Sequence, residues 1–149
     1  MNSFSSFRLF QACLLALSVL GSSVAHALMV EVQVRGIEKT KGSLWVALME
    51  SPEAFVEGAP DISKIIPVVK TEKKLIIDAL KPGGVYALCV FHDVDNDGKL
   101  DKGIFGNPTE PYAFSNNARR VFSMPKFDEA AFSVPERVGE RAVQIIELR

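Results

Sequence analysis

The residues of this chain best suited to chemistry form an acidic run after its middle. Asp93, Asp95, Asp97 and Asp101 occupy positions 1, 3, 5 and 9 of one short segment, and Gly98 occupies position 6. Alternate residues of such a loop direct their carboxylates toward one point, and glycine permits the sharp bend between them. Oxygen ligands at this density suit calcium better than zinc or copper. The spacing therefore predicts a calcium-binding loop.

The ligand set expected for this ion is the four aspartates and, at position 7, the backbone carbonyl of Lys99. Position 12 is Ile104, so the bidentate glutamate of an EF-hand is absent. Water, Asp101, Asn107 or Glu110 are the alternatives for the missing ligand. The expected dissociation constant is about 10⁻⁴–10⁻³ M, the range of extracellular modules. The competing interpretation is a solvated turn without an ion, because Asp, Asn and Gly also favour turns.

His92 directly precedes the acidic loop, where a histidine can act as a general base or a metal ligand. With Asp93 it defines one alternative function, a metal-dependent hydrolase. The second histidine of the chain, His26, falls in a segment that we expect to be removed. The chain has no G-x-S-x-G, H-E-x-x-H or glycine-rich phosphate motif. We therefore expect a protein that is not an enzyme.

A second group of candidate residues follows the acidic loop and mixes aromatic with small polar side chains. Tyr112 and Phe114 are suited to line a ligand surface, and Ser115, Asn116 and Asn117 are suited to supply hydrogen bonds. The structural alternative is that the aromatic rings pin a long loop onto the fold and the asparagines form a turn. The functional alternative is a metal-independent module that binds a peptide, a glycan or an envelope protein.

The N-terminus has the pattern of a secretory signal peptide over Met1–Ala27. It contains one charged residue, Arg8, then the apolar stretch Leu9–Leu20, and it ends in Ala25-His26-Ala27. We expect cleavage to leave residues 28–149 as a single domain that is exported, either periplasmic or secreted. No apolar run in that part of the sequence is long enough to span a membrane as a helix.

The composition bounds the class of protein. The chain has 149 residues, and 48% of them are hydrophobic, which is enough to fill the core of one domain. Seventeen basic residues balance 18 acidic ones, so the chain lacks the basic excess of a nucleic-acid-binding protein. Cys13 lies in the predicted signal peptide, and Cys89 lies in an apolar run that predicts a buried structural thiol.

The elements that must position these residues are predicted to be short strands. The apolar patterns predict strands over Met29–Gly36, Ser43–Met49, Ile65–Lys70, Lys74–Leu80, Val85–His92, Ala130–Val134 and Arg141–Leu148. Ser43–Met49 is apolar on both faces and Val85–His92 is the most apolar strand, so both are expected at the centre of a sheet. Only Ser51–Phe55, with Ser51 as N-cap, and Asp128–Ala131 are expected to be helical.

This spacing predicts an all-β fold, a sandwich of about seven strands with one long irregular loop over Gly98–Phe127. The turn and strand Leu80–Ala87 resemble those of transthyretin-like sandwiches. The fold class is therefore expected to be a small transthyretin-like or immunoglobulin-like β-sandwich.

Three longer strings carry a more specific resemblance. They are His92-Asp93-x-Asp95-x-Asp97-Gly98-Lys99-Leu100-Asp101, Phe105-Gly106-x-Pro108-x-Glu110-x-Tyr112-x-Phe114-Ser115-Asn116-Asn117-Ala118 and Pro125-x-Phe127-x-x-Ala130-x-Phe132. They resemble the bacterial exported family catalogued as domain of unknown function 2141, over nearly all of the chain after the predicted signal peptide. In that family the positions equivalent to Asp95 and Asp97 are often Asn, so the loop of this chain is more acidic than that of many family members. The resemblance implies export and a small β-sandwich, and it supplies no activity.

Overall fold

The computed structural model of the chain describes residues 28–121, 123–137 and 139–149. The predicted signal peptide, Met1–Ala27, lies outside these residues, and so do Cys13 and His26. In the described part of the chain eight strands form two sheets, which confirms the predicted all-β sandwich. Among the same residues, the helices are all too short or too polar to cross a membrane.

The two sheets differ in size and in the direction of their strands. The smaller sheet has the order β4-β1-β8, with strands Lys73–Leu80, Leu28–Arg35 and Ala142–Glu147. Its middle strand β1 is antiparallel to β4 and parallel to β8. The larger sheet is antiparallel with the order β3-β2-β5-β6, formed by Ile62–Pro67, Ser43–Met49, Val85–Asp93 and Tyr112–Phe114. The short strand β7 (Phe132–Ser133) also pairs with β5.

Alternating apolar side chains fill the space between the two sheets. On β1, Val30, Val32 and Val34 are fully buried, whereas Glu31 and Gln33 between them are only partly buried. The facing side chains of the larger sheet include Leu44, Val46 and Leu48 of β2 and Leu88 and Val90 of β5. Each such side chain contributes about 1.5–3 kcal/mol when it leaves water, so this cluster is the principal source of stability.

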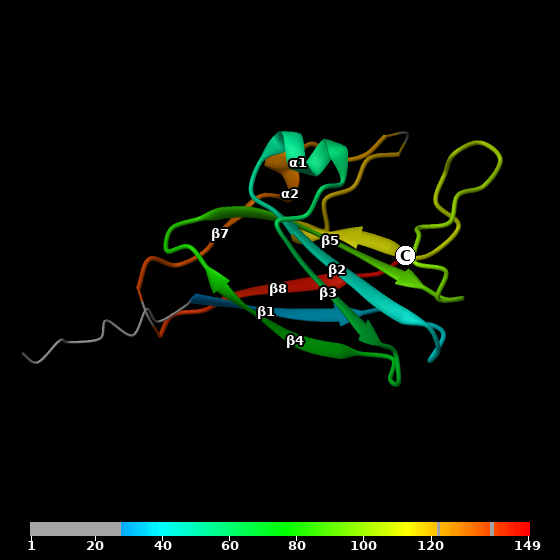
Figure 1. Cartoon of the computed structure of the whole chain (residues 1–149), viewed down its shortest axis with the longest axis horizontal. Helices are drawn as coiled ribbons and strands as arrows, with labels where there is room; N and C mark the ends of the chain where they lie inside the picture. The colour runs from blue at the N-terminus through cyan, green and yellow to red at the C-terminus, as the bar shows by residue number, and fades with distance from the viewer. Residues whose placement is uncertain (1–27, 122, 138) are drawn as a thin grey trace, which may run out of the picture.

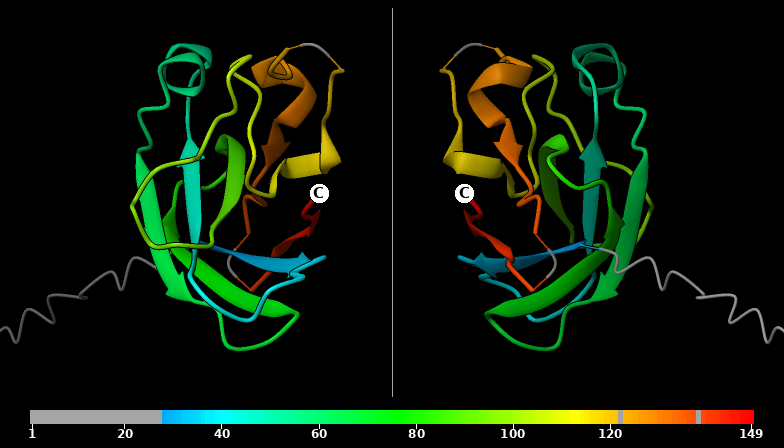
Figure 2. Two further views of the ribbon diagram at one scale, coloured as in Figure 1. Left: turned by 90° about the vertical axis from the view of Figure 1, so that its right-hand side faces the viewer. Right: turned by 90° about the vertical axis from the view of Figure 1, so that its left-hand side faces the viewer.

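The opposite face of the larger sheet packs against two short helices. These are α1 (Pro52–Glu57) and α2 (Phe127–Ala130), and Figures 1 and 2 show both on the side away from the smaller sheet. A second cluster lies beneath them and consists of Met49, Phe55, Ala87, Phe114 and Ala130. The larger sheet is thus a middle layer, which explains the apolar residues on both faces of β2 and β5 and confirms their central position. Cys89 packs against this cluster, and burial raises the pKa of its thiol to about 12.

The predicted helical turn at Ser51 is confirmed, and it extends to Glu57. The Ser51 hydroxyl accepts a hydrogen bond from the Ala54 amide at 3.1 Å, Pro52 begins the helix, and Gly58 ends it at a φ of 64°. Such capping satisfies amides and carbonyls that a short helix otherwise leaves without partners.

Other element boundaries differ from the prediction. Strand β3 starts at Ile62 and not at Ile65, because the Asp61 amide already donates to the Leu48 carbonyl and pairing with β2 continues from there. The expected strand Ala130–Val134 shortens to β7, since Ala130 ends α2. The expected irregular stretch Gly98–Phe127 contains β6 and a 3-10 helix, η1 (Ser115–Asn117).

Candidate metal centre

The acidic loop begins at Asp93, where β5 ends. Ser43 is the register partner of Asp93, so the start of β2 lies beside the start of the loop. In Figure 1 the yellow-green segment continues from this end of β5 and stands away from both sheets. The site is therefore built on the rigid end of two central strands.

Three of the predicted ligands come together in the structure. One carboxylate oxygen from each of Asp93, Asp95 and Asp97 lies within 4.8 Å of the others. Asp93 is buried, with 1% of its surface exposed, whereas Asp95 and Asp97 are exposed. Asp101 is not part of this cluster, and Lys99 contributes a backbone amide to the loop. Oxygen atoms at this spacing fit a hard divalent cation, whose six to eight ligands would include water and backbone carbonyls.

The carboxylate of Asp93 is fixed by three hydrogen bonds. Its Oδ1 accepts from the Asp97 amide at 3.2 Å, and its Oδ2 accepts from the Gly98 amide and from Trp45 Nε1, each at 3.0 Å. Because a carboxylate oxygen has about two lone-pair sites, Oδ2 is saturated and Oδ1 keeps one site free. Oδ1 is therefore the Asp93 atom available to a cation.

These contacts also decide the ionisation of Asp93. Desolvation by burial is the largest single influence and opposes ionisation. The hydrogen bonds that it accepts, chiefly those from Gly98 and Trp45, together outweigh it, so the pKa of Asp93 lies below its usual value. The buried carboxylate is thus negatively charged at neutral pH.

Local hydrogen bonds shape the rest of the loop. The Asp97 amide donates to Asp95 Oδ1 at 3.2 Å, and the Lys99 amide donates to Asp97 Oδ1 at 2.8 Å. Asn96 and Gly98 have φ values of 63° and 82°, a left-handed conformation that these two residue types adopt readily. The Ser43 hydroxyl donates to Asn96 Oδ1 at 2.8 Å and ties the loop to β2. The sequence of small turns directs alternate carboxylates to the same side.

Glu110 has a structural part that the sequence did not indicate. Its side chain is buried, with Oε1 accepting from the Val94 amide at 2.7 Å and Oε2 from the Asp101 amide at 3.2 Å. One carboxylate thus joins Val94, the residue after Asp93, to Asp101 at the end of the acidic loop. Glu110 is one of the predicted replacements for the missing metal ligand, and it is not among the three clustered carboxylates.

His92 is buried beside the loop and holds a neighbouring turn. Its Nε2 lies 2.7 Å from the carbonyl oxygen of Lys41, so this nitrogen donates. The ring also lines a cleft of about 330 Å³, together with Glu38, Lys39, Asp95, Asp101 and Glu110. Asp93 and His92 are consecutive, but their side chains engage different partners.

The polar groups of Ser115, Asn116 and Asn117 bind other parts of the fold. Ser115 Oγ accepts from the Leu88 amide on β5 at 2.8 Å and donates to the Ala130 carbonyl of α2. Asn116 Nδ2 donates to the Ala131 carbonyl at 2.8 Å. Asn117 binds the backbone of β8 through Ile145 O and Glu147 N, at 3.1 and 2.9 Å. These three residues link both sheets to α2.

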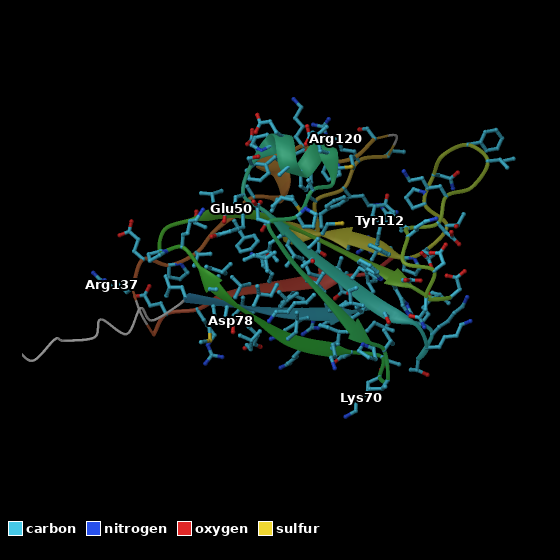
Figure 3. The ribbon with its side chains drawn as sticks, in the orientation of Figure 1. Glu50, Lys70, Asp78, Tyr112, Arg120 and Arg137 are labelled. Carbon is cyan, nitrogen blue, oxygen red and sulfur yellow. The ribbon has the colours of Figure 1, made fainter. Side chains whose placement is uncertain are left out.

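The two aromatic ligand-surface candidates lie on β6. Phe114 is buried against Phe55, and Tyr112, labelled in Figure 3, is half-buried with its amide donating to the Arg149 carbonyl. With Asn117 they line a small pocket of about 90 Å³. This volume is below the roughly 300–1,000 Å³ of typical small-molecule sites.

The fold and the loop together define a class: a small β-sandwich with an acidic loop at the end of a central strand. Residues 32–141 match the family described as uncharacterized protein conserved in bacteria (DUF2141). The match covers more than half of the chain, so the chain belongs to this family, as the sequence strings predicted. No curated protein and no solved structure matches it.

Proposed function

We propose that this chain is an exported, non-enzymatic β-sandwich protein whose acidic loop binds calcium. The ion would hold Asp93, Asp95 and Asp97 together and stabilise the loop and the segment that follows it. The observation that carries the proposal is the convergence of these three carboxylates within 4.8 Å. Like charges at this spacing repel one another, and a divalent cation converts that repulsion into attraction.

Calcium is the favoured ion because every side-chain ligand on offer is a carboxylate oxygen. Each of the three carboxylates retains lone pairs beyond those used in the loop's own hydrogen bonds. Three side-chain ligands are few for calcium, so we expect a dissociation constant of about 10⁻⁴–10⁻³ M. That affinity suits a compartment in which calcium is millimolar, which agrees with export.

Export is supported by the sequence pattern of Met1–Ala27, with its apolar stretch and its A-x-A end. A non-enzymatic role is supported by His92, the sole histidine after residue 27. Its Nε2 is engaged by the Lys41 carbonyl, and Asp93 binds amides of its own loop. The alternative of a hydrolase at His92 and Asp93 requires these contacts to be exchanged for substrate.

A metal-independent binding module at Tyr112–Asn117 is the second candidate. It rests on the pocket lined by Tyr112, Phe114 and Asn117. It has less support, because the side chains of Ser115, Asn116 and Asn117 already bind the backbone of the fold.

Thermal unfolding in chelator and in millimolar calcium tests the calcium proposal. At ten times the dissociation constant one bound ion adds about 1.4 kcal/mol. For a domain of this size the melting temperature would rise by roughly 3–8 °C. The matched variant is Asp95→Asn with Asp97→Asn. It removes two negative charges and keeps side-chain oxygens that accept hydrogen bonds from the amides of residues 97 and 99. Equal calcium responses in both proteins contradict the proposal.

A further inference from the structure

A small hairpin follows the acidic loop and presents two apolar side chains to solvent. Lys102 and Pro108 form a bridge, the Gly103 amide donates to the Asn107 carbonyl at 2.8 Å, and the Gly106 amide donates to the Gly103 carbonyl at 2.9 Å. The turn thus closed contains Ile104 and Phe105. We refer to these two residues as the apolar tip.

The apolar tip is the most exposed pair of large hydrophobic residues in the described part of the chain. Ile104 and Phe105 are 94% and 90% exposed. Val56 on α1 is also exposed, at 77%, but its apolar neighbour Phe55 is buried, so the two do not form an exposed pair. Single exposed apolar residues are common on protein surfaces, whereas adjacent ones at the end of a protruding loop indicate a contact surface. Figure 1 shows the loop standing out from the sheets.

The hairpin holds the tip in place without the help of a partner. Its base continues directly from the acidic loop, where the Thr109 amide donates to the Asp101 carbonyl at 2.8 Å. Glu110 then accepts from the Asp101 amide and ties this base to the start of the loop. A tip that is already ordered loses little conformational entropy when it enters an apolar medium.

The shape and size of the tip favour a lipid bilayer over a protein partner. A stable protein interface buries about 800 Å² on each side, far more than two side chains offer. A bilayer needs no complementary pocket, and it accepts a convex apolar tip of any outline. Exposed charges of both signs precede the tip, Lys99 and Lys102 as well as Asp95, Asp97 and Asp101, so charge does not decide between lipid headgroups.

We propose that the apolar tip inserts into the interface of a phospholipid bilayer. The contact is weak and reversible, because it buries only two side chains. It goes beyond the proposed calcium site and does not depend on it, since the contacts that close the hairpin join its own residues.

Cosedimentation with vesicles tests this inference. Residues 28–149 are used, because they contain both sheets and both apolar clusters and lack the apolar stretch Leu9–Leu20. The probes are vesicles of phosphatidylcholine with a minority of phosphatidylglycerol. We expect the protein to sediment with them, and Phe105→Ser to lower the association constant by about 10- to 100-fold. Ile104→Ser should weaken it similarly, and Val56→Ser, the matched control, should leave it unchanged.

A fluorescent reporter separates insertion of the tip from adsorption of another face. Phe105→Trp places an indole at the tip, and its emission should shift to the blue when vesicles are added. Val56→Trp should show no added shift. The inference is overturned if the protein does not sediment with vesicles, or if Phe105→Ser binds them as the parent protein does. It is also overturned if the tip instead mediates self-association that Phe105→Ser abolishes.

Both measurements are made in chelator and in millimolar calcium. If the tip variants lose vesicle binding in a buffer in which the parent protein binds, the result supports insertion of the tip. Vesicle binding is also compared between the two buffers. If Asp95→Asn with Asp97→Asn abolishes a difference between them, that difference reports on the ion site alone. Failure of the tip and failure of the ion site are therefore distinguishable.

Discussion

Replacing Glu110 with glutamine isolates the contact that joins the two ends of the acidic loop. The wild-type carboxylate is buried and accepts hydrogen bonds from the Val94 and Asp101 amides at 2.7 and 3.2 Å. Glutamine is nearly isosteric, yet its NH2 group cannot accept, so one amide must lose its partner. Hydrogen bonds to charged groups contribute about 1.5–3 kcal/mol each, and we expect Glu110→Gln to lower the free energy of unfolding by that amount.

Chemical denaturation in the presence of chelator measures this effect without any contribution from calcium. The corresponding fall in melting temperature is about 5–15 °C for a domain of this size. Glu72→Gln, at an exposed glutamate between β3 and β4, should change stability by less than about 0.5 kcal/mol. Glu110→Gln with wild-type stability in chelator, and a reduced response to calcium only, would show that Glu110 is a metal ligand and not a clamp.

Three further substitutions test other contacts of the site. Gly42→Ala should lower the free energy of unfolding in urea by more than about 3 kcal/mol, because the added Cβ would lie 2.0 Å from the Asp93 carbonyl oxygen. Its control is Gly58→Ala, at a residue with a similar φ and no atom within 4 Å of an added Cβ. This control should lower the free energy of unfolding by about 1 kcal/mol. Trp45→Phe keeps the stacking on Phe91 but removes the donor to Asp93, and circular dichroism should report a loss of about 1–3 kcal/mol. Asp93→Asn should be less stable than wild type at pH 7, and the difference should shrink in unfolding titrations toward about pH 2. The pKa of Asp93 is lower in the folded than in the unfolded protein, so its ionised carboxylate stabilises the fold at pH values above the unfolded pKa. That stabilisation is lost as the pH falls through the folded pKa. A stability difference that does not depend on pH would contradict this prediction.

The fold was largely predictable because its strands carry strong periodic signals. The alternation of Val30, Val32 and Val34 fixes which face of β1 is buried, and the apolar residues on both faces of β2 indicate a middle layer. The prediction was wrong where pairing partners decide the boundaries. Strand β6 has only three residues and exists because Tyr112–Phe114 pairs with β5, a long-range contact that no local pattern carries.

The clustered carboxylates of the candidate site were predictable from the sequence, whereas the residues that hold the loop in place were not. Asp93, Asp95 and Asp97 follow from alternate spacing within one loop, and the structure brings their carboxylates together. Trp45 and Glu110 come from distant parts of the chain, so only the folded arrangement shows that they hold the loop. The buried state of Asp93, in contrast with its exposed neighbours, could have been suspected because it ends an apolar strand.

The central claim is that calcium binds the loop between Asp93 and Asp101, and a calcium titration followed by two-dimensional NMR tests it most directly. The account predicts saturable shifts of the loop amides, above all those of Asp97 and Gly98, with a dissociation constant of about 10⁻⁴–10⁻³ M. The same titration of Asp95→Ala with Asp97→Ala, which removes two of the three clustered carboxylates, should give no such shifts. Loop amides that do not move up to about 10 mM calcium, ten times the weakest affinity expected, would contradict the account, and so would shifts that persist in the double variant.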